Sequence, residues 1–146
     1  MVPAAPSLLY SVKQVELATR ARLDELVRPA GITALQYTAL TVLERRDGMS
    51  GAELARNSFV TPQSMADLVG ALERRHLVAK APDPANRRRH LICLTRAGRD
   101  LLAEYAGPVR ALEDAMLAGF TAHERDTFRA FLNRCRAALA AAEPDR

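Results

Sequence analysis

The residues with the clearest chemical potential are cations gathered in one short stretch. Six of the 21 Lys and Arg residues, but only two of the 17 Asp and Glu residues, lie between residues 73 and 90. The rest of the chain holds 15 basic and 15 acidic residues, so this stretch carries the whole net charge of +4. A local basic patch on an otherwise balanced protein is typical of a phosphate-binding surface, although a solvated basic loop has the same composition. The six cations are Arg74, Arg75, Lys80, Arg87, Arg88 and Arg89.

Short polar side chains precede this basic stretch. Thr61-Pro62 has the form of a helix N-cap followed by proline, which places Gln63 and Ser64 in the first turn. Residues 58–60 separate this helix from an expected helix at 50–57, which is the spacing of a helix-turn-helix. The second helix of that motif enters the major groove of DNA with its N-terminal end. Thr61, Gln63 and Ser64 are therefore candidate base contacts, and the Gln63 amide matches the edge of an adenine.

Other candidates have both a structural and a DNA-binding interpretation. Ser50 is first a helix cap and second a phosphate contact. Arg74 either offsets the negative end of a helix dipole or contacts phosphate. The arginines at 87–89 are candidates for the minor groove or the backbone, because a narrow minor groove concentrates negative potential.

The residues for other chemistries are sparse. The three histidines, at 76, 90 and 123, lack metal-ligand spacing, and His90 with Cys93 supplies only two of the three or four ligands that zinc usually has. There is no Gly-rich phosphate loop. Cys93 in a strand and Cys135 on an apolar helix face are interpreted as small buried hydrophobic residues. We therefore expect no enzyme activity, no cofactor and no metal.

The length of 146 residues fits a single domain over 1–146. No apolar run approaches the length of a membrane span, and the N-terminus has no pattern of a signal peptide. Two cysteines far apart in the sequence favour reduced thiols, so we expect a cytoplasmic protein.

The elements that must position these side chains are mostly helices. We expect helices at 7–28, 33–46, 50–57 and 61–75, and the helix at 33–46 should bury Leu35, Ala39, Val42 and Leu43. Capping boxes are expected at three helix starts, formed by Thr33 with Gln36, Ser50 with Glu53, and Thr121 with Glu124. Strands at 77–80 and 90–94 form a β-hairpin whose loop, with its arginines, is too long for a tight turn. Helices from 95 and from 121 complete the chain, the first with a kink expected at Pro108.

This order of elements resembles the MarR (multiple-antibiotic-resistance regulator) family of winged helix-turn-helix proteins. Residues 32–40 resemble the family's second helix, and Glu53-Leu54-Ala55 its third. Residues 60–78 resemble the recognition helix and the start of the wing, and residues 83–99 the wing and its return. The chain departs from the family at His76, where glycine is usual at positive φ, and at Pro84-Ala85, where an arginine is common.

The resemblance implies a mainly α fold with a small β-hairpin wing. The winged DNA-binding region is expected at 33–94, and dimerisation helices at 7–28 and 95–142. It also implies a homodimer on a palindromic DNA operator and a small aromatic or phenolic effector, for which Tyr10, Tyr37 and Tyr105 are candidate contacts. The alternative for the terminal helices is that they pack on their own winged region. The sequence thus predicts a transcriptional regulator, most simply a repressor.

Overall fold

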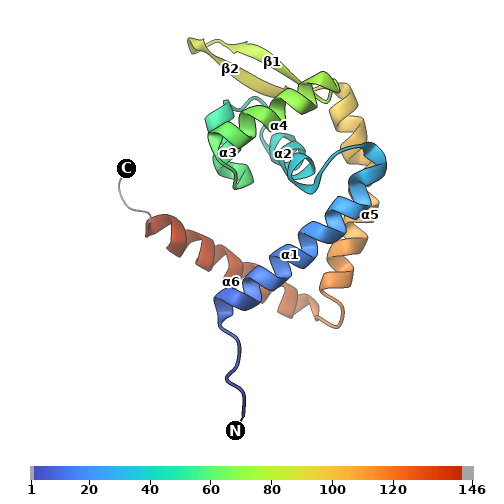
Figure 1. The fold of residues 1–146 in the computed structure, drawn as a ribbon, viewed down its shortest axis with the longest axis vertical. Helices are drawn as coiled ribbons and strands as arrows, with labels where there is room; N and C mark the ends of the chain where they lie inside the picture. Colours follow the sequence, from blue (N-terminus) through green and yellow to red (C-terminus); the bar gives the residue numbers. More distant parts are fainter. Residues whose placement is uncertain (1, 143–146) are drawn as a thin grey trace. The chain divides into compact units, whose positions relative to one another are not determined.

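A computed structural model describes residues 2–142, which form two compact units. The first unit ends at Arg110 and the second begins at Ala111, within one helix. The first holds α1 (Leu8–Val27), a 3-10 turn (Arg28–Ala30), α2 (Ala34–Arg45), α3 (Gly51–Ser58), α4 (Pro62–Arg74), β1 (Val78–Asp83) and β2 (Asn86–Leu94). Helix α5 (Arg96–Met116) starts in the first unit, and α6 (Ala122–Ala141) belongs to the second. The mainly α fold with one hairpin is confirmed (Figure 1).

The expected N-caps are all present. The side chains of Ser7, Thr33, Ser50, Thr61 and Thr121 each accept a hydrogen bond from a backbone amide of the following turn. The capping box is complete at Thr33 and at Thr121, where Gln36 and Glu124 reach back to the cap. The box predicted at Ser50 is only half right, because the Glu53 carboxylate binds Arg46 and Arg89 instead of the cap amide.

The core of the first unit lies among α2, α3, α4 and the base of the hairpin. Its fully buried members include Leu40, Leu43, Leu54, Met65 and Leu72. Ala39 is buried as predicted, but the burial predicted for Leu35 is wrong, since 37% of its surface is exposed. Leu35 lies in the first turn of α2, on the side that faces a cavity described below.

The hairpin is longer than the sequence indicated, and the loop prediction was wrong. Both strands continue outward, so that residues 84–85 make a short turn and the three arginines belong to β2. Asx contacts shape this end, because the Asp83 Oδ1 accepts from the Ala85 amide at 2.9 Å and the Asn86 Oδ1 from the Arg88 amide at 3.1 Å. Pro82 pairs with His90, which a two-stranded sheet permits because both of its strands are edges.

Two backbone positions next to α4 need unusual geometry. His76 has φ of 59°, as its place at the usual family glycine predicted. Phe59, which caps the end of α3, has φ of 61° and was not anticipated. In the same region Gly98 of α5 lies so close to the chain that a Cβ would stand 2.3 Å from the Leu77 carbonyl oxygen. The glycine thus permits α5 to start beside the first strand.

In the second unit, the Phe120 and Phe128 rings meet edge to face at 6.0 Å, and Arg125 pairs with Asp114 at 2.9 Å. Helix α6 leaves Phe131, Leu132 and Leu139 exposed, and α1 in the first unit leaves Leu8 and Val12 exposed. Among the described residues, no helix is both long and apolar enough to span a membrane.

Candidate nucleic-acid interface

The N-terminal turn of α4 presents polar side chains to solvent. Thr61, Gln63 and Ser64 are exposed, while Met65 and Val69 anchor the other side of the helix in the core. Thr61 Oγ1 accepts from the Ser64 amide at 3.1 Å and donates to Ser64 Oγ at 3.0 Å. These two hydroxyls therefore order the helix start in the turn that contains the exposed Gln63. The structure brings together the three residues expected to contact bases.

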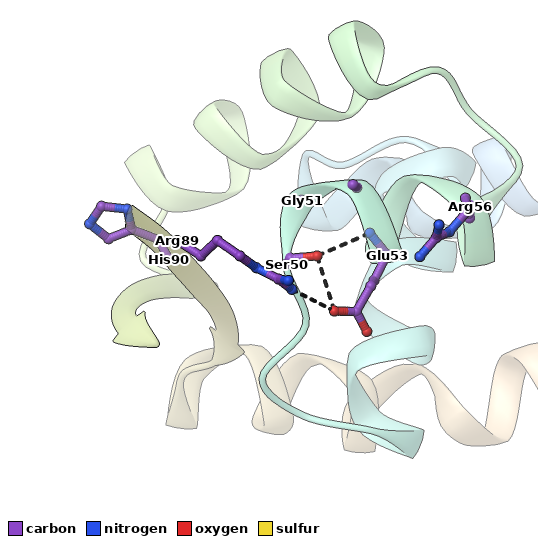
Figure 2. A pocket seen from close by; sticks show the side chains of 7 residues that line it. Ser50, Gly51, Glu53, Arg56, Arg89 and His90 are labelled. Atoms are coloured by element: carbon purple, nitrogen blue, oxygen red, sulfur yellow. Dashed lines mark hydrogen bonds and ion pairs between the residues drawn. The ribbon is translucent and has the colours of Figure 1, made fainter. Parts of the chain in front are cut away.

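The start of α3 is held by Ser50, whose surface is 8% exposed. Its hydroxyl accepts from the Glu53 amide at 3.2 Å and donates to Glu53 Oε1 at 3.1 Å (Figure 2). The pKa of the Glu53 carboxyl is lowered, above all by this hydroxyl; desolvation, the next effect in size, raises it, and Arg46 and Arg89 each lower it further. Ser50 is thus confirmed as a helix cap, and its role as a phosphate contact stays a prediction.

The wing arginines divide into two kinds. Arg87 and Arg88 are exposed, and no ion pair joins either to another residue in the described part of the chain. Arg89 instead turns toward α3, where its Nη2 lies 2.9 Å from Glu53 Oε1 and its Nε lies 3.8 Å from Asp83 Oδ2 (Figure 2). The three consecutive arginines therefore differ in their partners although the sequence makes them look alike.

The two arginines that end α4 lie apart from this surface. Arg75 extends over the chain at Gly31, where its Nη1 would stand 2.7 Å from an added Cβ. Arg74 is exposed and folds back toward Gly70 of its own helix. The phosphate contact of Arg74 stays a prediction.

A hollow of about 540 Å³ lies between the start of α3 and β2. A smaller hollow of about 290 Å³ continues from it toward α4. The sequence reasoning missed Glu53 and Arg56 here, because Glu53 looked like a capping residue and its partner Arg89 is 36 residues away. The lining of the larger hollow is Ser50, Gly51, Ala52, Glu53, Arg56, Arg89 and His90.

The tyrosines proposed as effector contacts lie in three different environments. Tyr37 is a core residue, and burial, with a smaller effect of Glu44, raises its pKa. Tyr10 is exposed on α1, and Tyr105 packs partly buried against the core. None of them lines the cavity of about 360 Å³ between α1, α2 and the end of α3. That cavity is lined by Glu16, Thr19, Arg20, Leu23, Ala34, Leu35, Thr38, Ser58 and Phe59.

The remaining candidate chemistries involve metal ligands and thiols. No group of three or more His, Cys, Asp or Glu residues within 2–142 is placed to hold a metal ion. Burial raises the pKa of the partly buried Cys93. The burial predicted for Cys135 is wrong, since this thiol is exposed on α6.

Comparison with known proteins identifies the family. A model described as "MarR family" matches residues 30–89. The transcriptional repressor Rv2887 of Mycobacterium tuberculosis is 31% identical over 86% of this chain and 90% of its own length. The chain belongs to the MarR family. The matched relative is named a transcriptional repressor, which points away from an enzyme. The resemblance inferred from the sequence is confirmed.

Two solved MarR-type structures bear on the site. The repressor CouR, in complex with a 23-mer DNA duplex, superimposes with a TM-score of 0.77 at 26% identity, covering 89% of this chain and 92% of CouR. Rv2887 in complex with p-aminosalicylic acid superimposes with a TM-score of 0.71 at 30% identity, covering 89% of this chain and 98% of Rv2887. The family match ends at Arg89, so it includes α3, α4 and the arginines of the wing.

Proposed function

We propose that this chain is a transcriptional repressor that binds a palindromic DNA operator as a homodimer. The observation that carries the proposal is the exposed polar turn of α4 beside a hairpin whose Arg87 and Arg88 have no ion-pair partner in the described region. An exposed polar helix start next to unpaired cations suits a duplex, because bases and phosphates are contacted together. The DNA complex of CouR and the repressor Rv2887 support this assignment.

In this proposal α4 enters the major groove with its N-terminal turn. Gln63 bonds an adenine through its amide, and Thr61 and Ser64 lie against neighbouring bases or the backbone. Arg87 and Arg88 at the outer end of the hairpin reach the minor groove or the phosphates beside it. Ser50 and Arg74 are the proposed phosphate contacts at the flanks.

Two copies are needed because a single helix reads only a few base pairs. The apolar residues left exposed on α1 and α6 supply surface for a second chain, which supports the terminal helices as dimerisation helices. The regulator acts by occupying its operator, so its function requires no catalytic step and no cofactor.

The cavity between α1, α2 and α3 is the proposed effector site. Arg20 lines this cavity in an ion pair with Glu16, which a ligand carboxylate would have to replace, and the buried Ser58 Oγ has no hydrogen-bond partner among the described residues. The complex of Rv2887 with p-aminosalicylic acid supports a small aromatic acid as the ligand class. Contact with Tyr10, Tyr37 or Tyr105 stays a prediction.

Selection of bound duplexes from a random library tests the function directly. The expected result is an enriched palindrome with two half-sites, bound more tightly than random duplexes at the same salt concentration. A pool with no enriched sequence, or with binding that does not depend on salt, would contradict the proposal.

A further inference from the structure

The three wing arginines occupy different electrostatic environments, and this difference points to different roles. We propose that Arg89 is a positioning residue, which Glu53 of α3 holds in an ion pair so that the hairpin presents Arg87 and Arg88 to DNA. Arg89 itself then contributes no phosphate contact. The inference rests on the proposed function, since it assigns roles within the same DNA-binding surface.

The ion pair joins two separate elements. Arg89 Nη2 lies 2.9 Å from Glu53 Oε1, which connects β2 to the first turn of α3 across 36 residues of sequence. The Glu53 carboxylate is itself held in place, because the Ser50 hydroxyl donates to it at 3.1 Å and Arg46 pairs with its other oxygen. A carboxylate fixed from two sides is a rigid anchor for the guanidinium.

The charge of Arg89 is already neutralised within the protein. Two carboxylates face its guanidinium, Glu53 at 2.9 Å and Asp83 at 3.8 Å. A DNA phosphate that binds Arg89 would have to displace these carboxylates or lie close to them. Because like charges repel, either arrangement is unfavourable. Arg87 and Arg88 have no such competitor in the described structure. Arg87 and Arg88, not Arg89, should therefore release counterions from DNA.

The position of Arg89 along β2 allows the ion pair to fix the direction of the hairpin. The base of the hairpin is fixed where Met49 and Ile92 exchange backbone hydrogen bonds of 3.2 and 2.7 Å. Arg89 lies three residues from Ile92 toward the outer end of the hairpin, about 10 Å along a strand. Arg87 and Arg88 lie next to it, closer to that outer end. Two attachment points fix the direction of the hairpin, whereas one would leave it free to pivot.

A salt series distinguishes a positioning arginine from a phosphate contact. Affinity for the selected operator is measured against salt for the wild type, Arg89→Ala, and the matched control Arg88→Ala, an exposed neighbour without an ion pair. Arg88→Ala should flatten the slope of log affinity against log salt by about one. Arg89→Ala should weaken operator binding about three- to tenfold and leave the slope unchanged, because Arg87 and Arg88 still reach the phosphates in the bound state and only the cost of orienting the hairpin rises. A slope that Arg89→Ala flattens as much as Arg88→Ala does would overturn the proposal.

A double-mutant cycle tests the partner. Glu53→Gln should weaken operator binding about as much as Arg89→Ala, and the double variant should lose no more than either single variant. Additive losses would overturn the pairing.

Hydrogen exchange of the free protein provides a readout without DNA. Amides of residues 86–89 should exchange faster in Glu53→Gln than in the wild type or in Arg88→Ala, because the outer hairpin is released. Unchanged exchange would overturn the positioning role. If no variant alters DNA binding, the proposal is overturned; if instead the wild type binds no duplex while exchange changes as expected, the proposed function fails and the structural role of Glu53 stands.

Discussion

Gln63 and Arg87 are single side chains on adjacent elements that would contact different parts of a duplex. Gln63 stands in the first turn of α4 and Arg87 in β2. Gln63→Ala should cost about 1–3 kcal/mol on the operator alone and leave the salt slope unchanged, because an amide–base contact carries sequence information. Arg87→Ala should weaken binding to all duplexes and flatten the slope by about one. Titrations of both variants against operator and random duplexes check this, and identical behaviour of the two would contradict docking by α4.

Glu53 also predicts a pH dependence of stability. Its pKa in the folded protein lies below the ordinary value of 4.5, so its interactions stabilise the fold above that pH. As the pH falls through the lower folded pKa, the carboxylate is protonated and that contribution is lost. The difference in unfolding midpoint between wild type and Glu53→Gln should therefore be largest near neutral pH and shrink below about pH 4.5. A difference that grows on acidification would contradict this assignment.

At the scale of elements, helix starts and the base of the hairpin were predictable, and the outer part of the hairpin was not. A cap is local, since Thr33, Thr61 and Thr121 each bond an amide within their own first turn. The partners of the Glu53 carboxylate were not predicted, because it pairs with Arg46 and Arg89, which are distant in sequence, and not with the cap amide. The turn at 84–85 depends on Asx contacts and on cross-strand pairing, so two prolines and three arginines looked like a long loop.

A substitution at Gly98 tests whether α5 must lie close to the chain at Leu77, just before β1. Gly98→Ala places a Cβ 2.3 Å from the Leu77 carbonyl oxygen, and we expect a loss of about 1–3 kcal/mol in the free energy of unfolding because backbone must move. Gly107→Ala is the matched control on the same helix, since no atom lies within 4 Å of its added Cβ. That variant should be about 0.5–1 kcal/mol more stable. Denaturant midpoints check both, and equal effects would contradict the contact.

At the scale of the whole molecule, the apolar residues exposed on α1 and α6 predict a homodimer. Leu8, Val12, Phe131, Leu132 and Leu139 are each 47% or more exposed in the single chain. Exposed apolar residues gathered on helices favour a partner surface. Sedimentation equilibrium should give twice the chain mass of 16.0 kDa, and Leu132→Glu should shift the population toward monomer. A monomeric wild type at tens of micromolar would contradict the prediction.

A two-fold dimer also fixes the geometry of its operator. Both copies of α4 must enter the major groove on the same face of the duplex, so the half-sites should be centred about one helical turn, roughly 10 base pairs, apart. Inserting about 5 base pairs between the half-sites turns the second one to the opposite face. Affinity should then fall to that of a duplex with one half-site, and the salt slope should drop because only one set of Arg87 and Arg88 remains in contact. Undiminished affinity for the lengthened operator would mean that each chain binds its half-site independently, and that the two copies of α4 are not held at a fixed spacing.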